Sequence, residues 1–102
     1  MEKYTLYLGL NDKDTHMQLI STVEAYKITN NILLSYTNGA TIFEANGIYK
    51  HEDGTFTIEK TLRIELLFVN TKVVSQIVED LKRAFNQESI AVQKSIIDGY
   101  LL

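Results

Sequence analysis

The sequence predicts an α+β fold in which two helices cover one face of a four-stranded antiparallel sheet. Four segments alternate apolar and polar residues with the two-residue period of a strand, and two segments carry apolar residues at helical spacing. Their order is strand, helix, strand, strand, helix, strand. The two middle strands are separated by a short polar stretch ending in Asp53-Gly54, which is a strong hairpin signal. With right-handed crossovers, this order gives the ferredoxin-like βαββαβ sandwich.

The composition is that of one globular domain. The chain has 102 residues, of which 45% are hydrophobic and 23% charged, and a chain of this length can bury one core without disulfides or metals. We expect a single domain over residues 1–102, with its core within about residues 3–95. The tail, residues 96–102, is more apolar than a free end and is expected to pack on the fold or on a partner subunit.

Several function classes are excluded or disfavoured. The absence of cysteine excludes disulfides, thiolate metal sites and thiol catalysis. A net charge of −3 without a basic stripe argues against binding of duplex nucleic acid. No segment approaches the roughly 20 apolar residues of a membrane span, and the alternating N-terminus does not resemble a signal peptide. We therefore expect a cytoplasmic protein that does not contact a membrane.

The first strand and the first helix have clear signals. Residues 3–10 alternate, and the expected buried face holds Tyr4, Leu6, Leu8 and Leu10. A helix is expected over about residues 22–36, because Ser21 and Glu24 have the spacing of a capping box. Its apolar stripe is Ala25, Ile28, Ile32, Leu33 and Tyr36. Gly39 is expected to end the helix as a left-handed C-cap.

The hairpin strands are expected over about residues 40–50 and 55–69. Gly47 lies inside the first of them and suggests a bulge or a close approach by another backbone or a ligand, with the bulge favoured. In the second strand, the residues expected to face the core are Leu62, Ile64, Leu66 and Phe68. Arg63, Glu65, Leu67 and Val69 are expected on the opposite face.

The last helix and strand follow the hairpin. Asn70 or Thr71 can cap a helix whose apolar stripe is Val74, Ile77, Val78, Leu81 and Phe85. Residues 89–95 alternate again and form the expected last strand, with Ile90 and Val92 on one face and Gln93 on the other.

Several short blocks resemble a bacterial family of small, often lipoprotein-like proteins of unknown function. The blocks are Leu6–Leu10, Gly39-Ala40-Thr41, Glu44–Tyr49, Asp53-Gly54, Glu59 and Phe85–Ile90. They match the family patterns G-x-T-x-x-x-A-x-G-x-[WY] and F-x-Q-E-S over roughly residues 4–92. The resemblance implies no settled activity. This chain lacks a lipoprotein cysteine, and a stand-alone cytoplasmic or phage-type version of the family would fit it.

The sheet face without helices is the first candidate site. The residues expected there or beside it are Tyr7, Glu44, Asn46, Lys60, Arg63, Glu65 and Gln93. An arginine among carboxylates and a tyrosine can bind a small polar or anionic ligand, and the tyrosines with Arg63 and Lys60 can stack on a nucleotide-like one. The same face can instead be an oligomer interface or a plain solvated surface.

Other polar clusters have weaker claims. Glu88 in Gln87-Glu88-Ser89 can act as an acid or base, but hydrogen bonding to the turn backbone is the favoured role. His16 and His51 lack metal-ligand partners at helical spacing, and His51-Glu52-Asp53 is favoured as a solvated turn. The loop that begins Asn11-Asp12 lacks the glycine of a calcium loop. We therefore predict no metal, no cofactor and no assigned catalytic residue.

The sequence favours a non-catalytic, homo-oligomeric binding protein, dimeric or larger, for a small polar or anionic ligand. A phage-type version would sequester a nucleotide signal. Two alternatives stay open. One is a protein–protein interaction or inhibitor module that docks through the hairpin tip or the apolar tail. The other is a small dimeric ferredoxin-like enzyme that uses a carboxylate such as Glu44 or Glu65 as base.

Overall fold

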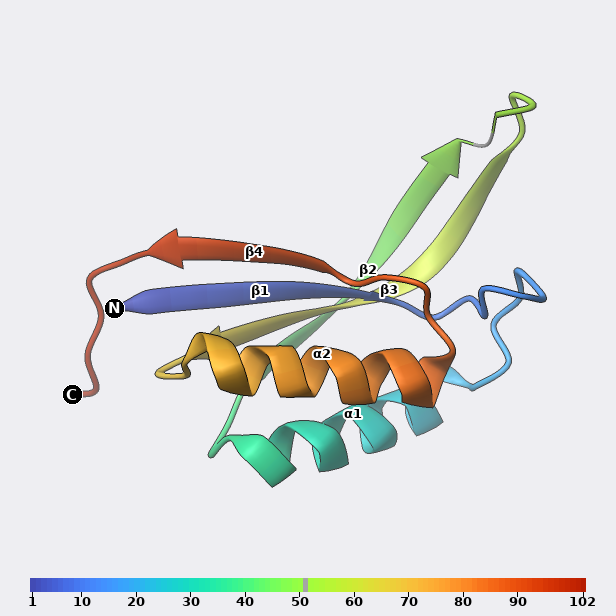
Figure 1. Cartoon of the computed structure of the whole chain (residues 1–102). Coiled ribbons are helices and arrows are strands. Elements are labelled where there is room, and N and C mark those ends of the chain that lie inside the picture. Colours follow the sequence, from blue (N-terminus) through green and yellow to red (C-terminus); the bar gives the residue numbers. More distant parts are fainter. Residues whose placement is uncertain (51) are drawn as a thin grey trace.

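The computed structural model describes residues 1–50 and 52–102. The elements are β1 (Glu2–Gly9), α1 (Thr22–Tyr36), β2 (Thr41–Lys50), β3 (Phe56–Leu67), α2 (Thr71–Phe85) and β4 (Ala91–Ile96). The strands form one antiparallel sheet in the order β2-β3-β1-β4, and both helices lie against the same face of it (Figure 1). The predicted α+β fold and element order are confirmed. His51, which the sequence analysis placed in a solvated turn, lies outside the described residues.

The core lies between the helices and the two central strands, β1 and β3. Both strands bury alternate residues, and α2 buries the apolar stripe that the sequence predicts. The fully buried large side chains are Leu6, Leu8, Leu62, Ile64, Leu66, Ile77, Leu81 and Thr29. The helix caps are also as predicted, because Ser21 Oγ accepts a hydrogen bond from the Glu24 N–H and Asn70 Oδ1 accepts one from the Val73 N–H.

Thr29 is an exception within this core, because its hydroxyl has no hydrogen-bond partner among the described residues. Burying an unpaired hydroxyl costs free energy that a methyl group of the same size does not cost. We expect Thr29→Val to raise the free energy of unfolding by up to about 1 kcal/mol, measured by urea denaturation. Thr29→Ala is the control and should lower it, because it leaves a cavity. A lower free energy of unfolding in Thr29→Val would contradict the conclusion that the hydroxyl is unpaired.

The end of α1 differs from the prediction. The helix stops at Tyr36, and its C-cap is Thr37 in extended backbone. Both the N–H and the hydroxyl of Thr37 donate to the Leu33 carbonyl, at 2.8 and 2.9 Å. These bonds pair the Leu33 carbonyl. In a helix that ends at a left-handed glycine, backbone N–H groups at and after the glycine pair the free carbonyls of the last turn instead. Gly39 therefore lies beyond the cap, with no left-handed backbone and no atom within 4 Å of where its Cβ would be.

The hairpin also corrects two predictions. The pairing of β2 with β3 runs without interruption from Thr41↔Glu65 to Lys50↔Phe56, so the predicted bulge at Gly47 is wrong. The groups that come close to Gly47 are side chains and not another backbone, since a Cβ there would lie 3.1 Å from the Thr61 hydroxyl.

The end of β3 is the second correction. The strand ends at Leu67, and Phe68 adopts a left-handed backbone with φ 59°. The expected alternation stops there. Phe68 is exposed rather than buried, and Val69 packs on the core although the sequence analysis assigned it to the opposite face.

The outer part of the hairpin extends past the layer formed by the helices (Figure 1). Ile48, Phe56 and Ile58 lie on its helix-side face but are exposed, because neither helix reaches them. Ile48 and Ile58 are directly paired across the two strands. The hairpin therefore carries an apolar surface that the isolated chain leaves in water.

Candidate functional site

The open sheet face brings four of the seven predicted site residues together. Tyr7 and Arg63 are register partners on β1 and β3, and the Tyr7 hydroxyl donates to Gln93 Oε1 at 3.4 Å. Glu65 forms ion pairs with Lys3 at 2.9 Å and with Arg63 at 3.1 Å. The hydrogen bond from Lys3 is the main reason that the pKa of Glu65 lies below its usual value. Its carboxylate is thus already paired within the chain.

The other three predicted residues lie on the opposite face. Phe43 is the register partner of Arg63, which leaves Glu44 opposite Leu62 and Asn46 opposite Lys60 on the helix side. Lys60 and Glu44 form an ion pair there, at 3.1 Å. The prediction that Glu44 and Asn46 share the open face is therefore wrong. Phe43 takes their place, with the Arg63 guanidinium 5.6 Å from its ring centroid.

The ion pairs on β1 predict a dependence of stability on pH. The Lys94 ammonium and a hydrogen bond from Tyr4 lower the pKa of Glu2, and the Lys3 ammonium lowers that of Glu65. A carboxyl whose folded pKa is depressed contributes stability above its unfolded value of 4.5 and loses it as the pH falls through the folded pKa. We therefore expect the urea midpoint to fall below pH 4.5. Glu65→Gln should reduce this dependence, whereas Glu79→Gln on α2 should not; equal profiles would contradict the assignment.

A second polar site lies at the end of the sheet where β1 stops. This junction cleft has a volume of about 410 Å³ and lies between the β1–α1 loop, the hairpin and the α2–β4 turn. It is lined by Asn11, Asp12, Lys13, His16, Tyr49, Lys50, Thr57, Glu59, Gln87, Glu88 and Ser89. None of these residues is among the seven predicted from the sequence.

Glu59 is the central group of the junction cleft. Its Oε2 accepts a hydrogen bond from the Asn11 N–H at 2.8 Å, and its carboxylate lies directly over Gly9. A Cβ on Gly9 would lie 2.6 Å from the Glu59 Cδ, so the glycine leaves the space that the carboxylate fills. Burial, the Glu59 charge and a hydrogen bond to Glu59 raise the pKa of Tyr49. The phenol therefore stays protonated beside the Glu59 side chain.

Asn86 holds the loop that forms one wall of the cleft. Its side-chain amide donates to Asp12 Oδ2 at 2.7 Å and to Asp14 Oδ2 at 2.9 Å, and its carbonyl accepts from the Lys13 N–H. Asp12 Oδ1 in turn accepts from the backbone of Asp14 and Thr15, at 2.8 and 2.9 Å. The Asn86 bond is the main cause of the lowered pKa of Asp12. The loop is therefore held in place by hydrogen bonds within the chain.

Asn86 offers a test of this arrangement. Its backbone is left-handed with φ 47°, so Asn86→Gly retains a tolerated backbone while removing the side-chain amide. We expect hydrogen exchange of residues 11–17 to become faster in Asn86→Gly, with the exchange of α2 and β1 unchanged. Asn86→Asp should have a larger effect, because it places a third carboxylate beside Asp12 and Asp14. Unchanged exchange in both variants would contradict the holding role.

The junction cleft brings together side chains that suit a polar, charged ligand. Glu59 and Glu88 provide carboxylates, Tyr49 an aromatic ring and Lys13 and Lys50 cations. Within the described residues, no three His, Cys, Asp or Glu side chains are grouped so that they could hold a metal ion.

Sequence reasoning missed this cleft because it favoured a structural role for Gln87-Glu88-Ser89. Gln87 does have such a role, since its side-chain amide donates to the Asn11 carbonyl. The available signal was the set of short blocks that carry the family resemblance. Tyr49, Glu59 and the Gln87-Glu88-Ser89 block, far apart in the sequence, line this cleft, and Gly9 lies beneath the Glu59 carboxylate.

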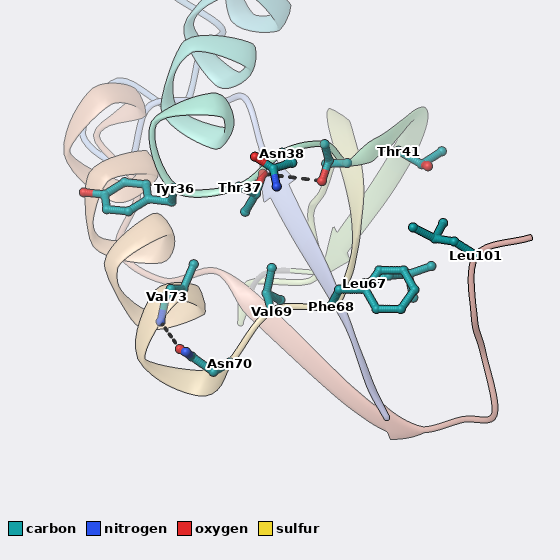
Figure 2. Close-up of a pocket in the computed structure, with 12 residues that line it drawn as sticks. Tyr36, Thr37, Asn38, Thr41, Leu67, Phe68, Val69, Asn70, Val73 and Leu101 are labelled. Atoms are coloured by element: carbon teal, nitrogen blue, oxygen red, sulfur yellow. Dashed lines mark hydrogen bonds between the residues drawn. The ribbon is translucent and has the colours of Figure 1, made fainter.

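A third region, the neutral groove, lies at the other end of the sheet (Figure 2). It has a volume of about 560 Å³ and is formed by the α1–β2 connection, the β3–α2 turn and the tail. Its lining residues are Tyr36, Thr37, Asn38, Gly39, Ala40, Thr41, Leu67, Phe68, Val69, Asn70, Val73 and Leu101. No charged side chain is among them, which separates this groove chemically from the junction cleft. Neither helix of the described chain is long and apolar enough to cross a membrane.

Comparison with solved structures supports the fold. A phage SAM lyase in complex with S-methyl-5′-thioadenosine superposes with a TM-score of 0.68 at 20% identity, over 92% of this chain and 79% of that one. The periplasmic divalent cation tolerance protein CutA from Archaeoglobus fulgidus gives 0.61 at 14% identity, over 99% and 88%. CutA1 from Oryza sativa gives 0.61 at 16% identity, over 99% and 84%. At these identities, the likeness concerns the fold alone.

The sequence comparisons concern the family. A search of curated proteins returns no match. The family model described as "protein of unknown function (DUF3574)" matches residues 3–97, which is most of the chain. The predicted membership of a family of unknown function is thereby confirmed, and the chain belongs to the DUF3574 family.

Proposed function

We propose that the protein binds a 5′-thioadenosine nucleoside in the junction cleft, with S-adenosylmethionine as the ligand of choice. One observation carries the proposal: residues of three separate blocks of the chain, Tyr49, Glu59 and Gln87–Ser89, line this one cleft, and Gly9 leaves the space that the Glu59 carboxylate fills. A phage SAM lyase of similar fold holds S-methyl-5′-thioadenosine, which supplies the ligand class. The cytoplasm, where S-adenosylmethionine is made, is the proposed location.

The charges of the cleft favour a sulfonium ligand over a simple anion. S-adenosylmethionine carries a sulfonium, an ammonium and a carboxylate. Glu59 and Glu88 are suited to the two cationic groups and Lys13 or Lys50 to the carboxylate, while Tyr49 offers an aromatic ring to the purine or to the sulfonium. The proposal thus retains the nucleotide-like ligand expected from the sequence but changes its charge and its site.

We propose further that the protein is a homo-oligomer. Tyr7 and Phe43 are exposed on the open sheet face, and Ile48, Phe56 and Ile58 are exposed on the hairpin. On the open face, Arg63 Nε is buried without a hydrogen-bond partner among the described residues. An exposed apolar surface together with an unpaired polar atom is typical of a face that a second copy covers. Native mass spectrometry tests this, and a monomer at all concentrations would contradict it.

Isothermal titration calorimetry tests the ligand. S-adenosylmethionine and S-methyl-5′-thioadenosine should bind, whereas adenosine 5′-monophosphate should bind weakly because its phosphate faces Glu59 and Glu88. The affinities of Tyr49→Phe and Glu59→Gln test whether the ligand binds in the cleft, and the affinity of Arg63→Ala tests whether it binds on the open face. Loss of binding in Arg63→Ala with retention in Glu59→Gln would move the site to the open face. Failure of both nucleosides to bind would refute the proposal.

Cleavage of the bound ligand is a second candidate function. The observation that favours it is the Glu59 carboxyl group, which lies beside the Tyr49 phenol, is held in place by the Asn11 N–H and has the chemistry of a base. In such a reaction the bond between the sulfonium sulfur and the amino-acid chain breaks, and its electron pair stays on sulfur. Mass spectrometry of the second product identifies the step. A lactone indicates attack by the ligand's own carboxylate, an unsaturated amino acid indicates proton removal by a base, and an unchanged ligand refutes cleavage.

A further inference from the structure

The neutral groove contains one residue from a distant part of the chain. Eleven of its twelve lining residues belong to segments 36–41 and 67–73, and the twelfth is Leu101 of the tail. Figure 2 shows Leu101 at the side of the groove where Leu67 and Phe68 lie. Neither the groove lining nor Leu101 carries a charged side chain, so their contact needs no charged side chain to be removed from water.

The tail reaches this position because its first part is fixed. The Ile97 N–H donates to the Met1 carbonyl at 2.9 Å, and the Met1 ammonium donates to the Ile97 carbonyl at 3.0 Å. Beyond these bonds, the chain turns back from the end of β4 toward the β3–α2 side of the sheet (Figure 1). Gly99 lies at this turn, where a Cβ would be 3.1 Å from the Met1 sulfur.

Phe68 gives the groove its second unusual feature. An aromatic residue rarely adopts a left-handed backbone, yet Phe68 has φ 59° and presents an exposed side chain at the rim. Strain of this kind persists where the surrounding structure requires it. The tail beside the groove is also mostly exposed to water. Tyr100 is 78% exposed, and Leu101 is 85% exposed although it lines the groove. Two apolar surfaces thus lie beside one another, each largely in water.

We propose that the neutral groove is the docking site of the chain's own segment Gly99–Leu102, with Leu101 as the residue that enters it. In the docked state the tail closes over Leu67 and Phe68 and links the end of β4 to the β3–α2 turn. The occupant is the tail of the same chain because Leu101 already lies in the lining and the Met1–Ile97 bonds hold the segment beside it. The groove is therefore closed by the protein itself and does not serve as a second nucleoside site.

Hydrogen exchange with mass spectrometry tests this docking. Leu101→Asp should speed exchange in residues 67–75, because a carboxylate does not enter an uncharged groove. Leu102→Asp is the matched control, since Leu102 is adjacent and exposed but does not line the groove. Equal exchange in the two variants overturns the proposal. A difference between Leu101→Asp and the unchanged protein that disappears on dilution also overturns it, because the tail of a second copy would then be the occupant.

A change in the groove gives the reciprocal test. Phe68→Gly removes the aromatic ring and also the cost of the left-handed backbone, so the free energy of unfolding should not fall as it does on loss of a buried phenylalanine. Exchange in residues 98–102 should nevertheless become faster, and protease cleavage there should increase. A stable Phe68→Gly variant with an unchanged tail contradicts the docking. This result is independent of nucleoside binding, which uses the opposite end of the sheet.

Discussion

Gly9→Ala is expected to lower the free energy of unfolding by about 1–2 kcal/mol and to disturb the junction cleft at the same time. Gly9 is buried at the end of β1, and the Glu59 carboxylate occupies the space that a Cβ on Gly9 would need. The new methyl group would displace this carboxylate from the Asn11 N–H. A hydrogen bond to a charged group contributes about 1.5–3 kcal/mol, and the stiffer unfolded chain offsets this by about 0.4–1 kcal/mol.

Gly39→Ala is the matched control for this prediction. No atom lies within 4 Å of its potential Cβ, and its backbone is not left-handed. Only the effect on the unfolded chain remains, so the variant should be unchanged or more stable by up to about 1 kcal/mol. Urea denaturation measures both variants.

A double-mutant cycle identifies the cause of the Gly9 effect. In a Glu59→Ala background the space beside Gly9 is free, so the additional loss caused by Gly9→Ala should vanish. A full loss in that background would show that the clash does not involve Glu59.

The parts of the fold that follow a regular period could be predicted from the sequence. β1 and α2 bury one face along their whole length, so their apolar residues recur at intervals of two and of three or four. The caps Ser21 and Asn70 were equally readable, because a cap depends on a side chain and the N–H three residues later. These are local properties, and the sequence contains them.

The position of the hairpin in the sequence could be predicted, but which face of its strands lies on the helix side could not. Its outer part extends beyond the helices, so apolar residues occur on both faces: Phe43 and Tyr49 on one, Ile48 and Ile58 on the other. The alternation of apolar residues therefore does not favour one face over the other, and a shift of one residue in the assignment exchanges the two faces. This is why Glu44 and Asn46 were assigned to the open face and Phe43 was not.

The junction cleft could not be predicted from local pattern, because its walls come from distant segments. Glu59 meets Asn11 across 48 positions, and Asn86 meets Asp12 across 74. The β1–α1 loop and the α2–β4 turn each have the appearance of an ordinary polar turn, and Glu59 has that of a polar strand residue. Only the pairing of β3 with β1 brings Glu59 beside the end of β1, and only the right-handed crossover brings the end of α2 there as well.

Glu59→Gln is expected to weaken binding of S-adenosylmethionine by about tenfold or more, and binding of S-methyl-5′-thioadenosine by much less. The two ligands share the nucleoside, but only the first carries the sulfonium and ammonium cations. Glutamine retains the size of glutamate and an oxygen that can accept from the Asn11 N–H, so the substitution removes mainly the charge. A contact with a charged group contributes about 1.5–3 kcal/mol, and tenfold corresponds to about 1.4 kcal/mol.

Calorimetry with both ligands distinguishes the possible roles of Glu59. Glu79→Gln, on the outer surface of α2, is the control and should leave both affinities unchanged. Equal weakening of the two ligands would mean that Glu59 supports the shape of the cleft and does not face the sulfonium. Unchanged affinities would place the nucleoside elsewhere, with Glu59 left as a structural partner of Asn11 and Tyr49. Because the two ligands differ by the aminocarboxypropyl group and the sulfonium charge it creates, the ratio of their losses shows how much of the effect of Glu59 acts on that part of the ligand.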